Sequence, residues 1–391
     1  MPRLPIPSRG HPALVALINH TGISANALVG RWARGTVPRV VLANSLSVAA
    51  ERAARTGLKK ESRRLAACAR QMVPGLARRV LAQAAEAALS GSARTAMRIG
   101  LQIRALVAEL QPRAIVITHE GHAWERVAFA GARSARPGIR CIGYQHAAVF
   151  RLQHAIRRSL APPYNPDLIL TAGTVGRNQL EAARELYGVP VAVLGSNRVS
   201  KPETSAHATP REIDACLVLP EGDINECNVL FDFSLSCAER LPDVRFVWRL
   251  HPLMSFARLV RRNRRLRRLP SNVVVSERPF DQDVAECRWA LYRGTTAIMA
   301  AVGGGLRPVY LRRPGEMTLD PLYQLEVWRV EIESAEEFVR VVERDRAGSA
   351  DVSEMRAAKE YCRGFYTPFD IGALLRALDR PDDRSLATTR C

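Results

Sequence analysis

Short apolar runs, each four to six residues long, recur through the second half of the chain and end at polar or glycine residues. They are rich in valine, leucine and aromatic residues, and segments with helical spacing separate them. Strands buried on both faces give such continuous runs, and the intervening helices fit crossover connections. We therefore predict a parallel sheet covered by helices. Its strands are expected at residues 215–219, 245–250, 272–275, 289–292 and 308–311.

The preceding part of the chain repeats this alternation of strand, loop and helix. Helical spacing runs over residues 48–90, with a break at Pro74 and Gly75, and over residues 93–110. Further helices are expected at about residues 124–135 and 175–187, which predicts a second Rossmann-like series. Its strands are expected at residues 114–118, 140–144, 168–171 and 191–194.

A polar stretch at residues 198–211 separates the two series. It contains two prolines and no apolar periodicity, which is typical of a linker. We predict an N-terminal Rossmann-like domain at residues 1–197 and a C-terminal one at residues 212–391, which ends in helices. The predicted fold class is α/β, with two domains of mostly parallel strands facing a central cleft. Ligands of such sheets bind at the carboxyl ends of the strands.

Composition limits the class of protein. The 391 residues contain no apolar run long enough to cross a membrane. The first ten residues carry three prolines and no apolar core of the secretory kind. Eight cysteines show neither CxxC pairing nor zinc-ligand spacing. We therefore predict a cytoplasmic protein with reduced thiols.

The net charge of +19 comes almost entirely from arginine and indicates an anionic partner. Six of the eight residues from Arg261 to Arg268 are arginine. Two interpretations are open: a solvated charged face, or contact with a polyanion or an anionic membrane surface. Contact with a membrane would place the protein peripherally on its inner face. No aromatic residues alternate with these arginines, so a nucleic-acid partner is not expected.

Polar residues follow several predicted strands of the second half. His251 and Pro252 come after the second strand, and an imidazole there could donate a hydrogen bond to a phosphate oxygen. Thr295 and Thr296 open a helix, where hydroxyl and N–H groups favour an anion. Gly222, after the first strand, would let the backbone approach a ligand closely. Each also has an ordinary explanation, as a strand end, a helix cap or a turn.

In the first half, ionisable side chains are densest at residues 119–125, HEGHAWE. Glu120 directly follows a predicted strand and could act as the general base toward an acceptor hydroxyl. Glu125 is the alternative, although a helix start alone explains an acidic residue there. The two histidines of this group lack a third ligand, so no metal is expected. His146, after the next strand, is a candidate to bind the acceptor or assist proton transfer.

Two groups of motifs resemble GT-B glycosyltransferases of bacterial surface-carbohydrate biosynthesis, which make capsule or lipopolysaccharide. WRLHP, VVSERPF and LYRGTTAIMAAVGGGLRPVYL are similar to the C-terminal halves of polysialyltransferases, capsule Kdo transferases and CDP-glycerol glycerophosphotransferases. HEGHAWERVAFA and CIGYQHAAV resemble the N-terminal domain of surface-carbohydrate biosynthesis proteins. The resemblance spans roughly residues 112–312.

The resemblance implies roles for single residues. Glu120 would be the catalytic base. The helix after Thr296 departs from the family pattern, because its sequence AIMAAVGGG lacks the acidic residue that often contacts the donor sugar or ribose. The residues implied at the donor phosphate, and near its base or ribose, are His251, Thr295, Thr296 and the segment from Arg278 to Phe280.

We interpret the sequence as an inverting, metal-independent glycosyltransferase with no cofactor beyond its nucleotide-sugar donor. Glu120 would deprotonate a hydroxyl of a surface polysaccharide or lipid-linked glycan. His251 and the helix start at Thr295 would stabilise the departing phosphate. The alternative is a non-catalytic scaffold of the same fold that holds an anionic partner or a membrane surface. Nucleotide binding distinguishes the two interpretations.

Overall fold

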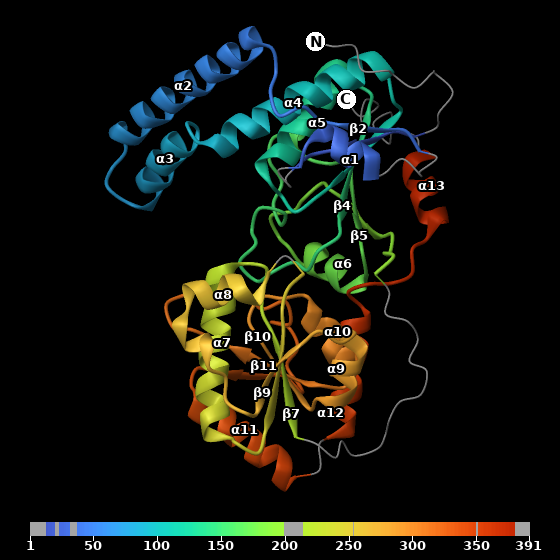
Figure 1. Cartoon of the computed structure of the whole chain (residues 1–391). Helices are drawn as coiled ribbons and strands as arrows, with labels where there is room; N and C mark the ends of the chain where they lie inside the picture. The colour runs from blue at the N-terminus through green and yellow to red at the C-terminus, as the bar shows by residue number, and fades with distance from the viewer. Residues whose placement is uncertain are drawn as a thin grey trace. The chain divides into compact units, whose positions relative to one another are not determined.

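The computed structural model describes residues 13–19, 23–31, 37–198, 214–252, 254–348 and 351–379. Most of the predicted linker, from residue 199 to residue 211, lies outside these residues. The chain divides into two compact units, which are described separately (Figure 1). The first comprises residues 1–144, 159–169 and 187–190, and the second comprises residues 145–158, 170–186 and 191–391.

The second unit contains a six-stranded sheet in which every neighbouring pair of strands is parallel. The order is β12-β11-β10-β7-β8-β9. All five strands predicted in this half are present, within one residue at each end. A short sixth strand, β12, which the apolar pattern did not indicate, forms one edge. The bounds are β7 (Ala215–Leu219), β8 (Arg245–Arg249), β9 (Val273–Ser276), β10 (Trp289–Tyr292), β11 (Arg307–Leu311) and β12 (Val330–Ile332).

Both faces of this sheet are buried, which explains its continuous apolar runs. In β7, Cys216 and Val218 join one apolar cluster with Trp248, whereas Leu217 and Leu219 join another. Figure 1 shows α7, α8 and α11 on one face and α9, α10 and α12 on the other. The predicted α/β class with parallel strands is therefore confirmed. These helices are α7 (Ile224–Arg240), α8 (Phe256–Arg262), α9 (Phe280–Glu286), α10 (Ala297–Gly303), α11 (Ala335–Ala347) and α12 (Val352–Arg363).

The segment after α12 packs against residues that lie far away in the sequence. The N–H of Val175 donates to the carbonyl of Gly364 at 2.9 Å, and the N–H of Ser196 donates to the carbonyl of Thr367 at 2.8 Å. These bonds tie the C-terminal segment to α6 (Thr174–Glu181) and to the end of β6 (Val191–Val193). The helix α6 stops short of the predicted end at residue 187, because the chain turns after Glu181. The last described helix is α13 (Ile371–Asp379).

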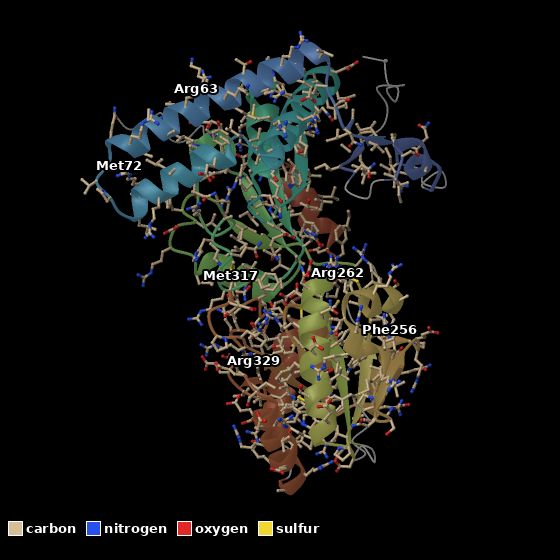
Figure 2. The ribbon with its side chains drawn as sticks, turned by 60° about the vertical axis from the view of Figure 1, so that its left-hand side comes forward. Arg63, Met72, Phe256, Arg262, Met317 and Arg329 are labelled. Carbon is tan, nitrogen blue, oxygen red and sulfur yellow. The ribbon has the colours of Figure 1, made fainter. Side chains whose placement is uncertain are left out.

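The first unit is mostly helical. Its long helices α2 (Val48–Gln71) and α3 (Leu76–Ala87) form a hairpin that turns at the predicted break, and Figure 2 shows Met72 at this turn and Arg63 on the side of α2 away from α3. None of the helices in the described part of the chain is long and apolar enough to cross a membrane. The remaining elements include α1 (Ala25–Arg31), α4 (Gly91–Leu110), α5 (Ala123–Ala135), β1 (Val15–Leu17) and β2 (Arg39–Val41).

A second, four-stranded sheet has the order β3-β4-β5-β6, and its first pair is parallel. The helices α4 and α5 pack closely beside it, and both contribute to one apolar cluster with β3. The backbones of α4 and α5 come very close together at Gly100 and Gly131. A Cβ added to Gly131 would lie 2.5 Å from the Gly100 carbonyl oxygen. The remaining strand bounds are β3 (Ala114–Thr118), β4 (Arg140–Gln145) and β5 (Leu168–Thr171).

Candidate active-site residues

His251 and Gly222 lie together at the carboxyl edge of the six-stranded sheet. The strands β7 and β8 are neighbours, so the loops that follow them are adjacent. A Cβ added at Gly222 would lie 3.0 Å from Cε1 of His251, so the half-buried imidazole packs directly against the exposed glycine. A side chain at position 222 would require a small shift of the imidazole. Pro252 follows and is exposed. The structure therefore brings together two residues that the sequence predicts at the donor site.

Thr295 and Thr296 follow β10. The strand β7 lies between β8 and β10 and pairs with both. Between the two threonines and β10, Gly294 packs against the carboxylate of Glu221, which leaves no room for a Cβ at this position. Both threonines are half-buried. The hydroxyl of Thr295 accepts the N–H of Ala297 at 3.3 Å, whereas Thr296 makes no capping bond through its side chain. The loops after β7, β8 and β10 thus converge on one edge of the sheet.

A buried arginine underlies this edge, and sequence reasoning did not select it. Arg293, only 4% exposed, places Nε 2.8 Å from Glu226 and Nη2 2.8 Å from Glu316. The carboxyl of Glu221 lies nearby. Burial raises its pKa and the charge of Glu226 raises the pKa further, whereas Arg293 opposes the shift. Arg293 directly follows β10, so a search for polar residues at strand ends, which selected Thr295, would also have found it.

The predicted base- or ribose-binding residues lie in a segment held by its own contacts. The guanidinium of Arg278 donates to both oxygens of Glu286, at 2.6 and 2.8 Å. The ring of Phe280 lies 5.3 Å from the guanidinium of Arg249. Arg249 in turn pairs with the buried carboxylate of Asp283 at 2.9 Å. These contacts fix the segment after β9, and its role toward a donor base or ribose stays a prediction.

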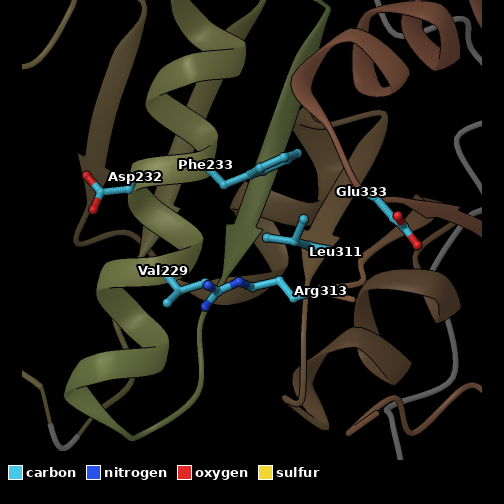
Figure 3. Close-up of a pocket in the computed structure, with 6 residues that line it drawn as sticks. All are labelled: Val229, Asp232, Phe233, Leu311, Arg313 and Glu333. Carbon is cyan, nitrogen blue, oxygen red and sulfur yellow. The ribbon is translucent and has the colours of Figure 1, made fainter. Parts of the chain in front are cut away.

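A shallow hollow of about 310 Å³ lies elsewhere in the second unit, beside α7 and the end of β11 (Figure 3). None of the predicted site residues lines it. The hollow is bounded by Val229, Asp232, Phe233, Leu311, Arg313 and Glu333.

In the first unit, Glu125 organises the loop that carries Glu120. Its carboxylate is 1% exposed and accepts the backbone N–H groups of Glu120 at 3.0 Å, Gly121 at 2.8 Å and His122 at 2.9 Å. One of its oxygens also lies 3.0 Å from Nδ1 of His119. These contacts form a capping arrangement at the start of α5. Glu125 is therefore a structural residue of the loop.

His119 lies completely buried beneath the same loop. Its ring meets Phe129 edge-on at 5.7 Å and packs over Gly143. Burial lowers the pKa of the imidazole below its usual value, although the neighbouring Glu125 carboxylate opposes the shift.

The carboxylate of Glu120 has a different environment. Its side chain is 27% exposed and its Oε2 lies 3.3 Å from Nε2 of the exposed His122. The next residue, Gly121, has a φ of +86°, which favours glycine and turns the chain into α5. Glu120 is thus the accessible carboxylate of the loop, while Glu125 is occupied by the backbone. The catalytic role of Glu120 stays a prediction.

His146 follows β4 and belongs to the second unit. It is half-buried, and the preceding Gln145 is buried with its carboxamide against Gly176. Among the described residues, no three histidine, cysteine or acidic side chains gather in a way that could hold a metal ion.

No protein-family model matches the chain, and no curated protein matches it in sequence. Among solved structures, it is similar to the glycosyltransferase SnogD from Streptomyces nogalater, with 14% identity, a TM-score of 0.48 and coverage of 90% of this chain and 89% of that one. For the spinosyn rhamnosyltransferase SpnG the identity is 13% and the TM-score 0.49, with coverage of 93% of this chain and 91% of that one. For a UDP-N-acetylglucosamine 2-epimerase the identity is 12% and the TM-score 0.41, with coverage of 80% of this chain and 90% of that one. Because the likenesses are this distant, the fold assignment rests on strand order and register, and function must be argued from the chain's own residues.

Proposed function

We propose that the chain is a glycosyltransferase that takes a sugar from a nucleotide-activated donor. The observation that carries this proposal is the packing of His251 against Gly222 at the carboxyl edge of a parallel sheet. The hydroxyls of Thr295 and Thr296 follow the adjacent strand. An imidazole N–H, exposed glycine backbone and hydroxyls at this edge suit a phosphate group.

The proposed reaction is a single displacement. An acceptor hydroxyl attacks the anomeric carbon of the donor sugar, and Glu120 takes the hydroxyl proton. The bond from that carbon to the phosphate oxygen breaks, and the nucleotide leaves with the electron pair. We assign stabilisation of its negative charge to His251 and the threonines rather than to a metal ion. Attack opposite to the leaving group inverts the anomeric configuration.

The proposed acceptor is a surface polysaccharide or a lipid-linked glycan, built on the cytoplasmic side of the membrane. This part of the proposal is supported by the motif resemblance around Glu120 and His251. His146 is assigned to acceptor binding or to assistance of proton transfer, because it follows the strand next to β3 in its sheet.

The arginine-rich segment at the end of α8 and directly after it supports a contact with an anionic membrane surface. All six arginines from Arg261 to Arg268 are exposed, while Leu266 anchors the segment in the core. Arg265 pairs with Asp232 and Glu239 at 3.5 and 3.8 Å. The other five have no ion pair among the described residues, and each is expected to attract anionic lipid by about 1 kcal/mol near the surface. Sedimentation with anionic vesicles that weakens in salt supports this contact, and equal binding to neutral vesicles contradicts it.

A second candidate function is a non-catalytic scaffold of the same fold. The observation that favours it is the group of carboxylates at the proposed phosphate position, where Glu221, Glu226 and Glu316 lie around the buried Arg293. Arg313 also pairs with Glu316, at 2.8 Å, so three carboxylates face two guanidinium groups and would oppose a phosphate. The scaffold interpretation requires that no nucleotide binds.

A thermal-shift screen of the full chain against CMP-, CDP-, UDP- and GDP-sugars tests the proposal. A donor that binds only the folded state raises the melting temperature. His251→Ala should abolish the shift and keep the melting temperature of the unliganded protein. His154→Ala is the matched control, because His154 is an exposed histidine of the same unit. No shift with any donor, or an unchanged shift in His251→Ala, contradicts the proposal.

A further inference from the structure

The turn between α2 and α3 exposes an unusual concentration of apolar side chains. Every residue from 70 to 80 is exposed. The exposed fractions are 38% for Met72, 84% for Val73, 71% for Leu76 and 57% for Val80. We call these four residues the hairpin tip. Single exposed aliphatic residues are common, but four within nine residues at a turn are a local concentration of exposed apolar side chains, which is a feature of surfaces that bind a partner.

The hairpin itself does not use the tip to hold its two helices together. Small residues pack between α2 and α3, where Ser62, Ala69 and Ala85 are buried. The other end of α2 is tied to α4 by the ion pair of Glu51 with Arg98 at 2.8 Å. No apolar core cluster of the described chain includes a residue of the tip. The tip therefore contributes little to the fold.

Basic side chains lie at the tip and along the part of α2 that leads to it. Between residues 59 and 80 there are seven lysines and arginines and one acidic residue, a net charge of +6. The single acid, Glu61, is paired with Arg64 at 2.6 Å. The other six basic side chains have no ion-pair partner in the described structure. These residues, which we call the basic rim, are Lys59, Lys60, Arg63, Arg70, Arg78 and Arg79.

We propose that the hairpin tip inserts into the interface of a membrane that contains anionic lipids. Met72, Val73 and Leu76 enter the boundary of the acyl chains, and the basic rim binds lipid phosphates. A lipid surface places an apolar layer under an anionic one, which matches the order of tip and rim. A second copy of the chain would bring two basic rims together, and nucleic acid would leave the aliphatic side chains exposed to water.

This inference does not depend on nucleotide binding or on glycosyl transfer. It also differs from the contact proposed for the arginine-rich segment, because that segment offers charge without an exposed aliphatic tip. Insertion predicts that apolar side chains reach the acyl region, whereas adsorption through arginine alone keeps them in water.

The test uses the full chain and sucrose-loaded vesicles of phosphatidylcholine with or without phosphatidylglycerol. The double variant Val73→Ser/Leu76→Ser should lower partitioning onto the anionic vesicles at least about tenfold, because it removes apolar area and keeps all charges. Val352→Ser/Leu375→Ser is the matched control, since both side chains are more than half exposed outside the tip. It should bind as the unaltered protein does.

A second measurement reports insertion in an otherwise native chain. Val73→Trp should gain fluorescence that brominated acyl chains quench on the anionic vesicles. Equal partitioning of the serine variant and the control would overturn the proposal. So would a tryptophan at position 73 that stays unquenched while the protein is bound. Saturable binding of the tip to an acidic protein, with no binding to lipid, would also overturn it.

Discussion

Two carboxylates five residues apart, Glu120 and Glu125, illustrate how surroundings separate structure from chemistry. Glu125 is buried and accepts three backbone N–H groups, whereas Glu120 is partly exposed and close to His122. We predict that Glu120→Gln keeps the melting temperature and donor binding and lowers transfer roughly 10²–10⁴-fold, the usual contribution of a positioned base.

Glu125→Gln serves as the comparison. Its amide can accept fewer of the backbone N–H groups, so the free energy of unfolding should fall by about 1–3 kcal/mol. Thermal unfolding and initial transfer rates of both variants check the pair. A Glu120→Gln variant with full activity would move the base elsewhere, and an unstable Glu120→Gln would make that residue structural.

Glu221 should make nucleotide binding depend on pH. Its pKa is raised by burial and by Glu226, with Arg293 opposing. As the pH falls through this raised value, the carboxyl becomes neutral, so repulsion of a donor phosphate decreases and affinity should rise. We predict that Glu221→Gln binds the nucleotide more tightly at neutral pH and loses this part of the pH dependence. Calorimetric titrations of both proteins from pH 7 to pH 5 provide the measurement. Parallel pH profiles would exclude Glu221 from the site.

Single residues were predicted from sequence where their place after a strand is decisive. His251, Gly222 and Thr295 follow neighbouring strands of one sheet, and the structure places the loops that carry them side by side. Side-chain pairing over eight residues, such as that of Arg278 with Glu286, depends on the course of the loop after β9. The apolar pattern carries no information about that course.

At the scale of elements, strands buried on both faces were the most predictable feature. The β7 run is apolar at every position because helices cover both faces of the sheet. The edge strand β12 has only three residues and one buried side chain, so its pattern cannot be distinguished from that of a loop. The helix α6 ends early although its sequence keeps helical spacing, which shows that propensity alone did not set its end.

Close packing of α4 on α5 gives a prediction about elements. Gly131→Ala would place a Cβ 2.5 Å from the carbonyl of Gly100, so we expect a loss of about 1–3 kcal/mol in the free energy of unfolding. Gly57→Ala is the matched control, because Gly57 lies in α2 with nothing within 4 Å of an added Cβ. It should stabilise the protein slightly, since alanine favours helix. Chemical denaturation distinguishes them, and equal effects would contradict the packing described.

At the scale of the whole molecule, charge and apolar surface act on different partners. The net charge of +19 favours anionic partners in general, whereas the proposed phosphate site lies at one edge of the six-stranded sheet. The basic composition was legible from the sequence. The exposure of the hairpin tip could not be predicted from the sequence, because Met72, Val73 and Leu76 have the same apolar character as residues that are buried in a core.

Hydrogen exchange with and without a bound nucleotide sugar tests the central claim most directly. The claim is that the carboxyl edge at β7, β8 and β10 binds the donor phosphate. Saturating donor should protect the backbone amides that follow these three strands, including those of Gly222, His251 and Thr296. In His251→Ala this protection should be lost at the same donor concentration. Protection confined to the hollow between α7 and β11, or no protection with any donor, would contradict the account.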